Sequence, residues 1–300
     1  MYPLVMMRGG PMGTTVTRTS IDAAGLTFEA LASGTDGEPV ILLHGMPETS
    51  AMWIPAMDLL ARQGYRCLAF DQRGYSPGAR PDDVAAYDHR HLGQDVLDVA
   101  DAAGFNRFHL IGHDWGAAAG WCAVDLDGGE RIASYVSLSI PHYRGFAEAT
   151  RDDPAVQAYR DFLGAVQAPG QIVESFWSAD TFARLRDVWT AHDEELVERY
   201  LAVLGQDGAL TAALNWYRAT NGHMTVLDGT SLDFAPVSLP TMLVWGNRDP
   251  YVSRMAVDVG RGYVAGPHEF VELDAGHWLV QEEPELVGVL LKRHLSRHPL

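Results

Sequence analysis

The chain has 300 residues, of which 47% are hydrophobic and 20% are charged, so it holds enough apolar material for a large core. Its formal net charge is -17, which argues against binding to nucleic acid or to an anionic membrane, because both need basic patches. The sole lysine, Lys292, lies near the C-terminus, which argues against a Schiff-base lysine and a P-loop. We therefore expect neither nucleic acid nor a membrane as a partner.

Residues 1–14 are rich in Gly, Pro and Met and are expected to form a flexible leader. They lack the apolar segment of a signal peptide, and no later run reaches the length of a membrane span. The two cysteines, Cys67 and Cys122, lie in apolar contexts and are expected to be buried free thiols. We interpret the chain as a cytoplasmic protein.

The first half of the chain alternates predicted strands with predicted helices. Alternating polarity predicts two antiparallel strands at 15–21 and 26–32. Continuous apolar runs predict buried strands at 39–43, 66–70, 108–113 and 133–140. Helical periodicity is found at 50–63 and 88–104. This alternation predicts a doubly wound, mostly parallel α/β sheet, whose ligand sites lie at the carboxyl ends of its strands.

The pattern changes after the strand at 133–140. Five helical segments without a strand follow, at 154–166, 170–177, 179–189, 193–205 and 208–219. Strands return at 240–246 and 268–273, and an amphipathic helix at 283–297 closes the chain. We therefore predict a core formed by 15–141 and 237–300, with a helical cap domain, 142–236, inserted into it.

A sharp turn between a predicted strand and a helix marks the centre of the molecule. Gly112 and Gly116 flank Asp114 at two residues on either side, the spacing of a nucleophile elbow. Such a turn holds its central side chain exposed at the top of the sheet. A carboxylate in that place suits attack on an alkyl carbon, which gives a covalent ester.

Two further residues lie where the partners of a nucleophile are expected. Asp249 follows the strand at 240–246, and His277 lies in the loop after the strand at 268–273. The chain order nucleophile, acid, histidine is that of α/β hydrolases. We predict that His277 activates water and that Asp249 orients His277.

Backbone N–H groups are expected to stabilise the oxyanion that forms during ester hydrolysis. One is predicted at Trp115, directly after the nucleophile, and the other at Met46, in the loop after the strand at 39–43. The Met46 side chain itself is expected to serve packing.

Together these motifs resemble the α/β-hydrolase-fold epoxide hydrolases. The resemblance covers the chain from about residue 18 onward and rests on His44-Gly45-Met46-Pro47-Glu48, Gly112-His113-Asp114-Trp115-Gly116, Asp249 and Gly276-His277. It implies that the aspartate attacks an epoxide carbon and that histidine-activated water releases a vicinal diol. The implied substrate is a small hydrophobic epoxide.

In that family, tyrosines of the cap polarise the epoxide oxygen. One lies in an Asn-Trp-Tyr-Arg motif, found here at 215–218, which implies that Tyr217 is the acid. The position of the second tyrosine is occupied by Ala165. Tyr159 lies six residues earlier and could substitute only if its helix is shifted. We predict His44, Trp115 and Tyr159 as substrate-binding residues.

Two other functions stay open at this point. A dehalogenase would use the same triad with a halide leaving group; the Trp115 indole would serve as one halide donor, but Met46 stands where haloalkane dehalogenases commonly have a second. A non-catalytic relative would bind a small hydrophobic ligand beneath the cap, although an intact triad argues against it. We expect no cofactor and no metal, because no zinc-type ligand spacing is present. Homodimer formation is left open.

Overall fold

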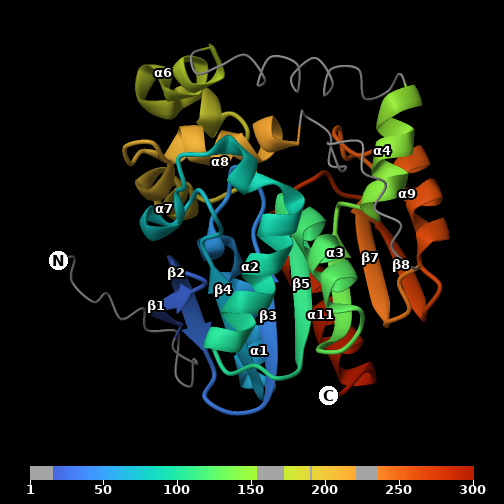
Figure 1. Cartoon of the computed structure of the whole chain (residues 1–300). Coiled ribbons are helices and arrows are strands. Elements are labelled where there is room, and N and C mark those ends of the chain that lie inside the picture. Colours follow the sequence, from blue (N-terminus) through green and yellow to red (C-terminus); the bar gives the residue numbers. More distant parts are fainter. Residues whose placement is uncertain (1–15, 154–171, 190, 221–235) are drawn as a thin grey trace.

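Eight strands form one twisted sheet in the computed structural model, which describes residues 16–153, 172–189, 191–220 and 236–300 (Figure 1). The strand order is β1-β2-β4-β3-β5-β6-β7-β8, and β2 pairs antiparallel with β1 and β4 while the other neighbours are parallel. The strands are β1 (Thr17–Ala23), β2 (Leu26–Ser33), β3 (Glu38–Leu43), β4 (Tyr65–Phe70), β5 (Phe108–His113), β6 (Ile132–Leu138), β7 (Thr241–Gly246) and β8 (His268–Leu273). All eight lie within two residues of their predicted bounds, which confirms the predicted α/β sheet.

Helices cover both faces of this sheet. In Figure 1, α2 and α3 lie on the near face and α1 and α11 on the far face. The core helices are α1 (Ile54–Arg62), α2 (His89–Ala102), α3 (Trp115–Asp127), α9 (Arg254–Gly260), α10 (Leu279–Glu282) and α11 (Pro284–Arg297). Short 3-10 turns are found at η1 (Ser50–Trp53), η2 (Pro77–Ala79), η3 (Val84–Tyr87) and η5 (Arg261–Tyr263). Cys67 and Cys122 are free and buried, as predicted.

Helix α3 is buried along most of its length because small residues let it approach the sheet closely. A Cβ atom added to Gly116 would lie 2.4 Å from the carbonyl oxygen of Leu43 on β3. A Cβ atom added to Gly120 would lie 2.6 Å from the hydroxyl oxygen of Tyr135 on β6. Glycine at these two positions therefore sets the N-terminus of α3 directly against the strand ends.

The described residues between β6 and β7 form helices and add no strand to the sheet. The helices of this insertion are α4 (Tyr143–Asp152), α6 (Ile172–Arg186), α7 (Glu194–Leu204) and α8 (Ala209–Ala219). In Figure 1, α6, α7 and α8 lie together over the end of the sheet at which β5 leads into α3. The domain bounds at residues 142 and 236 stay predictions.

Two details of the insertion differ from the sequence prediction. The segments 170–177 and 179–189 were expected to be separate helices, but residues 172–186 form the single helix α6, since no Gly or Pro interrupts them. Helix α4 was not predicted, because its sequence is mostly polar and its main apolar residues are Tyr143, Phe146 and Ala149. These three residues are spaced three apart and are all buried, which is the signal that marks the helix.

Candidate active site

The turn between β5 and α3 holds Asp114 in a strained backbone conformation. Its φ of 51° and ψ of -123° lie outside the regions that L-residues favour, at a typical cost of about 1–3 kcal/mol. Such strain persists only where the surroundings fix it, and a Cβ added to Gly112 would lie 2.5 Å from the carbonyl oxygen of Gly116. The glycine pair thus permits the tight turn that was predicted from the sequence.

Asp114, His277 and Asp249 converge from three separate strand ends. The Nε2 atom of His277 lies 3.3 Å from Oδ2 of Asp114, and its Nδ1 atom lies 2.7 Å from Oδ2 of Asp249. The side chains of His277 and Asp249 are almost fully buried, and that of Asp114 is one-tenth exposed. The structure therefore brings the three predicted residues together in one hydrogen-bonded line.

The loop after β7 fixes the orientation of Asp249. Its Oδ1 atom accepts hydrogen bonds from the backbone N–H groups of Tyr251 (2.8 Å) and Val252 (3.1 Å). This leaves Oδ2 facing the imidazole of His277. A carboxylate held by backbone donors in this way keeps the ring of its histidine partner in one orientation.

The two carboxylates keep His277 protonated. Burial alone would lower the pKa of His277, but the charge of Asp249 and the hydrogen bonds to Asp114 and Asp249 outweigh this and raise it to about 10. At neutral pH the imidazolium ring therefore carries a charge between two carboxylates. Removal of either negative charge would lower the pKa of His277 again.

A second buried histidine contacts the backbone of the loop that carries His277. Nε2 of His113 lies 2.9 Å from the carbonyl oxygen of His277, which also accepts a hydrogen bond from the hydroxyl of Ser139 (2.9 Å). Nδ1 of His113 lies 3.0 Å from Oε2 of Glu48. Both ring nitrogens lie within hydrogen-bond distance of oxygen atoms, so His113 links Glu48 to the backbone of His277.

Glu48 is completely buried and links the core to the insertion. Its Oε1 atom accepts hydrogen bonds from the side chains of His192 (3.1 Å), Tyr200 (3.1 Å) and Gln281 (2.6 Å). Burial alone would raise the pKa of Glu48, but the hydrogen bonds and charges of His113 and His192 lower it to about 2. Glu48 therefore stays ionised at neutral pH.

A backbone N–H group lies beside the Asp114 carboxylate, close to the N-terminus of α3. The N–H of Met46 donates to Oδ1 of Asp114 at 2.8 Å. Trp115 is the first residue of α3, where an N–H has no acceptor within its own helix. The helix N-terminus also favours negative charge at this point. The arrangement suits the stabilisation of an oxyanion on the carboxyl group of Asp114.

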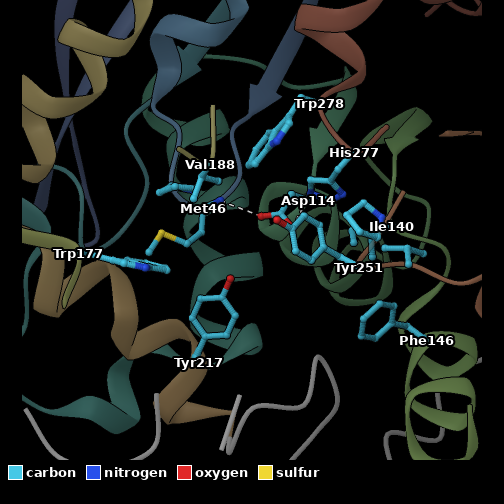
Figure 2. A pocket seen from close by; sticks show the side chains of 13 residues that line it. Met46, Asp114, Ile140, Phe146, Trp177, Val188, Tyr217, Tyr251, His277 and Trp278 are labelled. Carbon is cyan, nitrogen blue, oxygen red and sulfur yellow. Dashed lines mark hydrogen bonds and ion pairs between the residues drawn. The ribbon is translucent and has the colours of Figure 1, made fainter. Parts of the chain in front are cut away.

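A cavity of about 320 Å³ opens in front of Asp114 and His277. Its wall is mainly apolar and comes from both the core and the insertion, through Met46, Ile140, Phe146, Trp177, Val188 and Trp278. Among the described lining residues, only Tyr217 and Tyr251 carry a hydroxyl group. In Figure 2 the hydroxyl of Tyr217 points toward Asp114 from the insertion side. The cavity therefore suits an uncharged, largely apolar ligand.

Three predicted substrate-binding residues do not appear on the described wall of the cavity. His44 is buried, with Nδ1 2.9 Å from the carbonyl of Gly45, while its Nε2 accepts the N–H of Gln72. The ring of Trp115 is buried behind Tyr217, edge-on at 4.8 Å between ring centroids. Tyr159 and Ala165 lie outside the described residues. Substrate contact by these residues stays a prediction.

Within the described ranges, no three His, Cys, Asp or Glu side chains are placed to hold a metal ion together. The same part of the chain contains no helix that is long and apolar enough to cross a membrane.

The model of the alpha/beta hydrolase fold family matches residues 38–284. The chain belongs to the α/β-hydrolase family. Epoxide hydrolase A of Mycobacterium tuberculosis is 29% identical to this α/β hydrolase, over 92% of this chain and 96% of that protein. Epoxide hydrolase 4 of Mus musculus is 30% identical, over 90% of this chain and 77% of that protein. The crystal structure of Epoxide Hydrolase A from Mycobacterium thermoresistibile is 26% identical, with a TM-score of 0.81 over 95% of this chain and 100% of that chain. This enzyme is thus an epoxide hydrolase-like α/β hydrolase.

The structure of this α/β hydrolase also adds site residues that the sequence prediction missed. The Met46 side chain packs in the core, as expected, and it also lines the cavity, where its sulfur accepts a hydrogen bond from the hydroxyl of Tyr75 (3.0 Å). Tyr251 and Trp278 pack edge-on against His277, with ring centroids 5.0 and 4.9 Å away. Each directly neighbours a predicted triad motif in the sequence, which is the signal that could have identified it.

Proposed function

We propose that this chain is an epoxide hydrolase that works through a covalent ester on Asp114. The observation that carries the proposal is the placement of the Tyr217 hydroxyl across the cavity from Asp114 (Figure 2). Asp114 itself lies in line with His277 and Asp249. A nucleophile on one side of the substrate and a proton donor on the other are what the opening of an epoxide ring requires.

In the first step, Oδ2 of Asp114 attacks one epoxide carbon, because Oδ1 is held by the N–H of Met46. The new oxygen–carbon bond forms as the carbon–oxygen bond of the ring breaks. The ring oxygen takes the bond's electron pair together with the proton of the Tyr217 hydroxyl, which leaves Tyr217 as a phenolate. The product of this step is a neutral ester of Asp114 with a hydroxyl group on the neighbouring carbon.

In the second step, His277 removes a proton from water, and the water oxygen attacks Cγ of Asp114. Ester formation has by then removed the negative charge of Asp114, one of the causes that raise the pKa of His277. The imidazolium can therefore return a proton to the Tyr217 phenolate through solvent, and the neutral imidazole then acts as the base. The resulting oxyanion is stabilised by the N–H groups of Met46 and Trp115. Its collapse breaks the bond between Cγ and the alkyl oxygen, which takes the proton of the added hydroxyl group and leaves as the diol. Asp114 is a carboxylate again, and His277 keeps the proton taken from water.

The position of Trp115 weighs against the dehalogenase alternative. The indole of Trp115 was the halide donor expected from the sequence, and the described wall of the cavity does not include Trp115, although it includes the indole rings of Trp177 and Trp278. The wall does include the Tyr217 hydroxyl, which suits a leaving oxygen that must be protonated.

Parallel assays with styrene oxide and 1-chlorohexane test the proposal. We expect wild type to form the diol without halide release, and Asp114→Ala to lose at least about 10⁴-fold in kcat. Asp274→Ala is the matched control, because this aspartate lies in the same loop region as His277 with an exposed side chain. Halide release without diol would contradict the proposal in favour of a dehalogenase. Activity on neither compound would favour a ligand-binding relative.

A further inference from the structure

The residue that precedes Tyr217 on α8 is anchored to the core by a single hydrogen bond. Trp216 is fully buried, and its indole Nε1–H donates to the backbone carbonyl of Arg73 at 2.8 Å. An indole N–H can only donate, so burial makes this acceptor necessary. The bond crosses from the insertion to the loop that follows β4.

The acceptor is itself held rigidly. The guanidinium group of Arg73 binds the carboxylate of Asp95 on α2 through two bonds, from Nε to Oδ2 at 2.8 Å and from Nη2 to Oδ1 at 2.5 Å. Both side chains are nearly buried, with 10% of Arg73 and 3% of Asp95 exposed. A bidentate pair of this kind allows one geometry only, so the Arg73 carbonyl is a fixed point of the core.

The backbones of this loop and of α8 are in direct contact beside the Trp216 bond. A Cβ atom added to Gly74 would lie 2.9 Å from the carbonyl oxygen of Ala212 on α8. Arg80 donates from Nη2 to the side chain of Gln206, which precedes α8 (2.9 Å). The loop that follows β4 therefore supports α8, and we call this loop the seat of α8.

The ring of Trp115 connects this seat to the nucleophile. It packs against Trp216 with ring centroids 5.7 Å apart and edge-on against Tyr217 at 4.8 Å. Trp115 directly follows Asp114 in the chain. The direction of the Tyr217 hydroxyl relative to Asp114 therefore depends on how α8 is seated against Trp115.

We propose that Trp216 is a positioning residue for epoxide opening, whose bond to the Arg73 carbonyl seats α8 so that the Tyr217 hydroxyl faces Asp114. This inference rests on the proposed function. Loss of the indole N–H displaces the proton donor while leaving the groups that hydrolyse the ester in place. Misplacement of a reacting group by about 1 Å costs roughly 10²-fold in rate.

Single-turnover kinetics of Trp216→Phe with styrene oxide separate the two steps, with ester formation and decay followed by mass spectrometry. We expect ester formation to slow by about 10- to 100-fold and ester hydrolysis to keep its wild-type rate. Trp121→Phe is the matched control, because Trp121 is equally buried and donates from Nε1 to the carbonyl of Ile140 (3.2 Å) away from α8. This control should keep both rates.

A double-mutant cycle distinguishes positioning from general loss of structure. If Trp216 acts through Tyr217, Trp216→Phe has no further effect on ester formation in a Tyr217→Phe background. An equal effect in both backgrounds, or equal slowing of both steps, would overturn the proposal. If Trp216→Phe does not fold, Asp95→Asn repeats the test, because asparagine has nearly the same volume as the aspartate that it replaces. Absence of any ester in wild type would instead contradict the proposed function itself.

Discussion

The Nε2 atom of His277 lies 3.3 Å from Oδ2 of Asp114, so the base and the nucleophile of the proposed reaction form an ion pair before substrate arrives. With its pKa raised to about 10, His277 holds a proton at neutral pH and cannot accept one from water. Esterification of Asp114 removes this constraint. In the proposed reaction, the base therefore becomes available only after the nucleophile has reacted.

Asp114→Asn tests this coupling, because the amide is neutral like the ester. We expect the pKa of His277 to fall by more than about one unit, since a nearby opposite charge typically shifts a pKa by 1–3 units. NMR titration of the ring carbon signals of His277 measures the change. Asp274→Asn, which removes an exposed charge in the same region, should leave the titration as in wild type. An unchanged pKa in Asp114→Asn would show that Asp114 does not hold the proton on His277.

The close approach of α3 to the backbone that ends β3 leaves no room for a side chain at Gly116. A Cβ atom there would lie 2.4 Å from the carbonyl oxygen of Leu43 and 2.5 Å from that of His44, and backbone cannot move aside cheaply. We expect Gly116→Ala to lower the free energy of unfolding by roughly 2–4 kcal/mol. Urea unfolding measures this free energy. Gly262→Ala is the control, because no heavy atom lies within 4 Å of a Cβ atom added to Gly262. Equal stability of both variants would contradict the close packing of the elbow.

The charge of Glu48 makes the free energy of unfolding depend on pH in the acid range. Its folded pKa of about 2 lies below the ordinary 4.5, so its contribution to stability is complete above pH 4.5 and is lost as pH falls toward 2. This difference of about 2.5 pKa units corresponds to about 3 kcal/mol. We expect Glu48→Gln to be much less stable than wild type at pH 7, with the gap narrowing below pH 4.5.

Urea unfolding between pH 3 and pH 7 measures this gap. Glu198→Gln is the control, because Glu198 is an exposed partner of Arg186 and its replacement should change stability little. A gap between wild type and Glu48→Gln that stays constant over this pH range would show that the Glu48 charge does not carry the effect.

The elbow and the triad were predictable because each element leaves a local sequence signal. The carboxyl ends of β5, β7 and β8 share one edge of a largely parallel sheet, so residues that follow these strands meet there. Asp114, Asp249 and His277 each follow a strand that the apolar pattern marks clearly. Chain order and strand placement were therefore sufficient to bring them together.

The contacts of Glu48 could not be predicted in this way. His113 is 65 residues away in the chain and Tyr200 is 152 residues away, and the second contact depends on how the insertion is seated. No periodicity links such positions. Helix α9 (Arg254–Gly260) was missed for a different reason, since its seven residues span only about two turns and give too short a pattern.

The accumulation of a covalent adduct on His277→Gln tests the central claim most directly. The variant keeps Asp114, Tyr217 and the N–H of Met46 but has no base for hydrolysis. After exposure to styrene oxide, mass spectrometry should find one substrate mass added per chain, located on the peptide that contains Asp114. A His277→Gln protein that stays unmodified under conditions in which wild type forms the diol would contradict the ester mechanism.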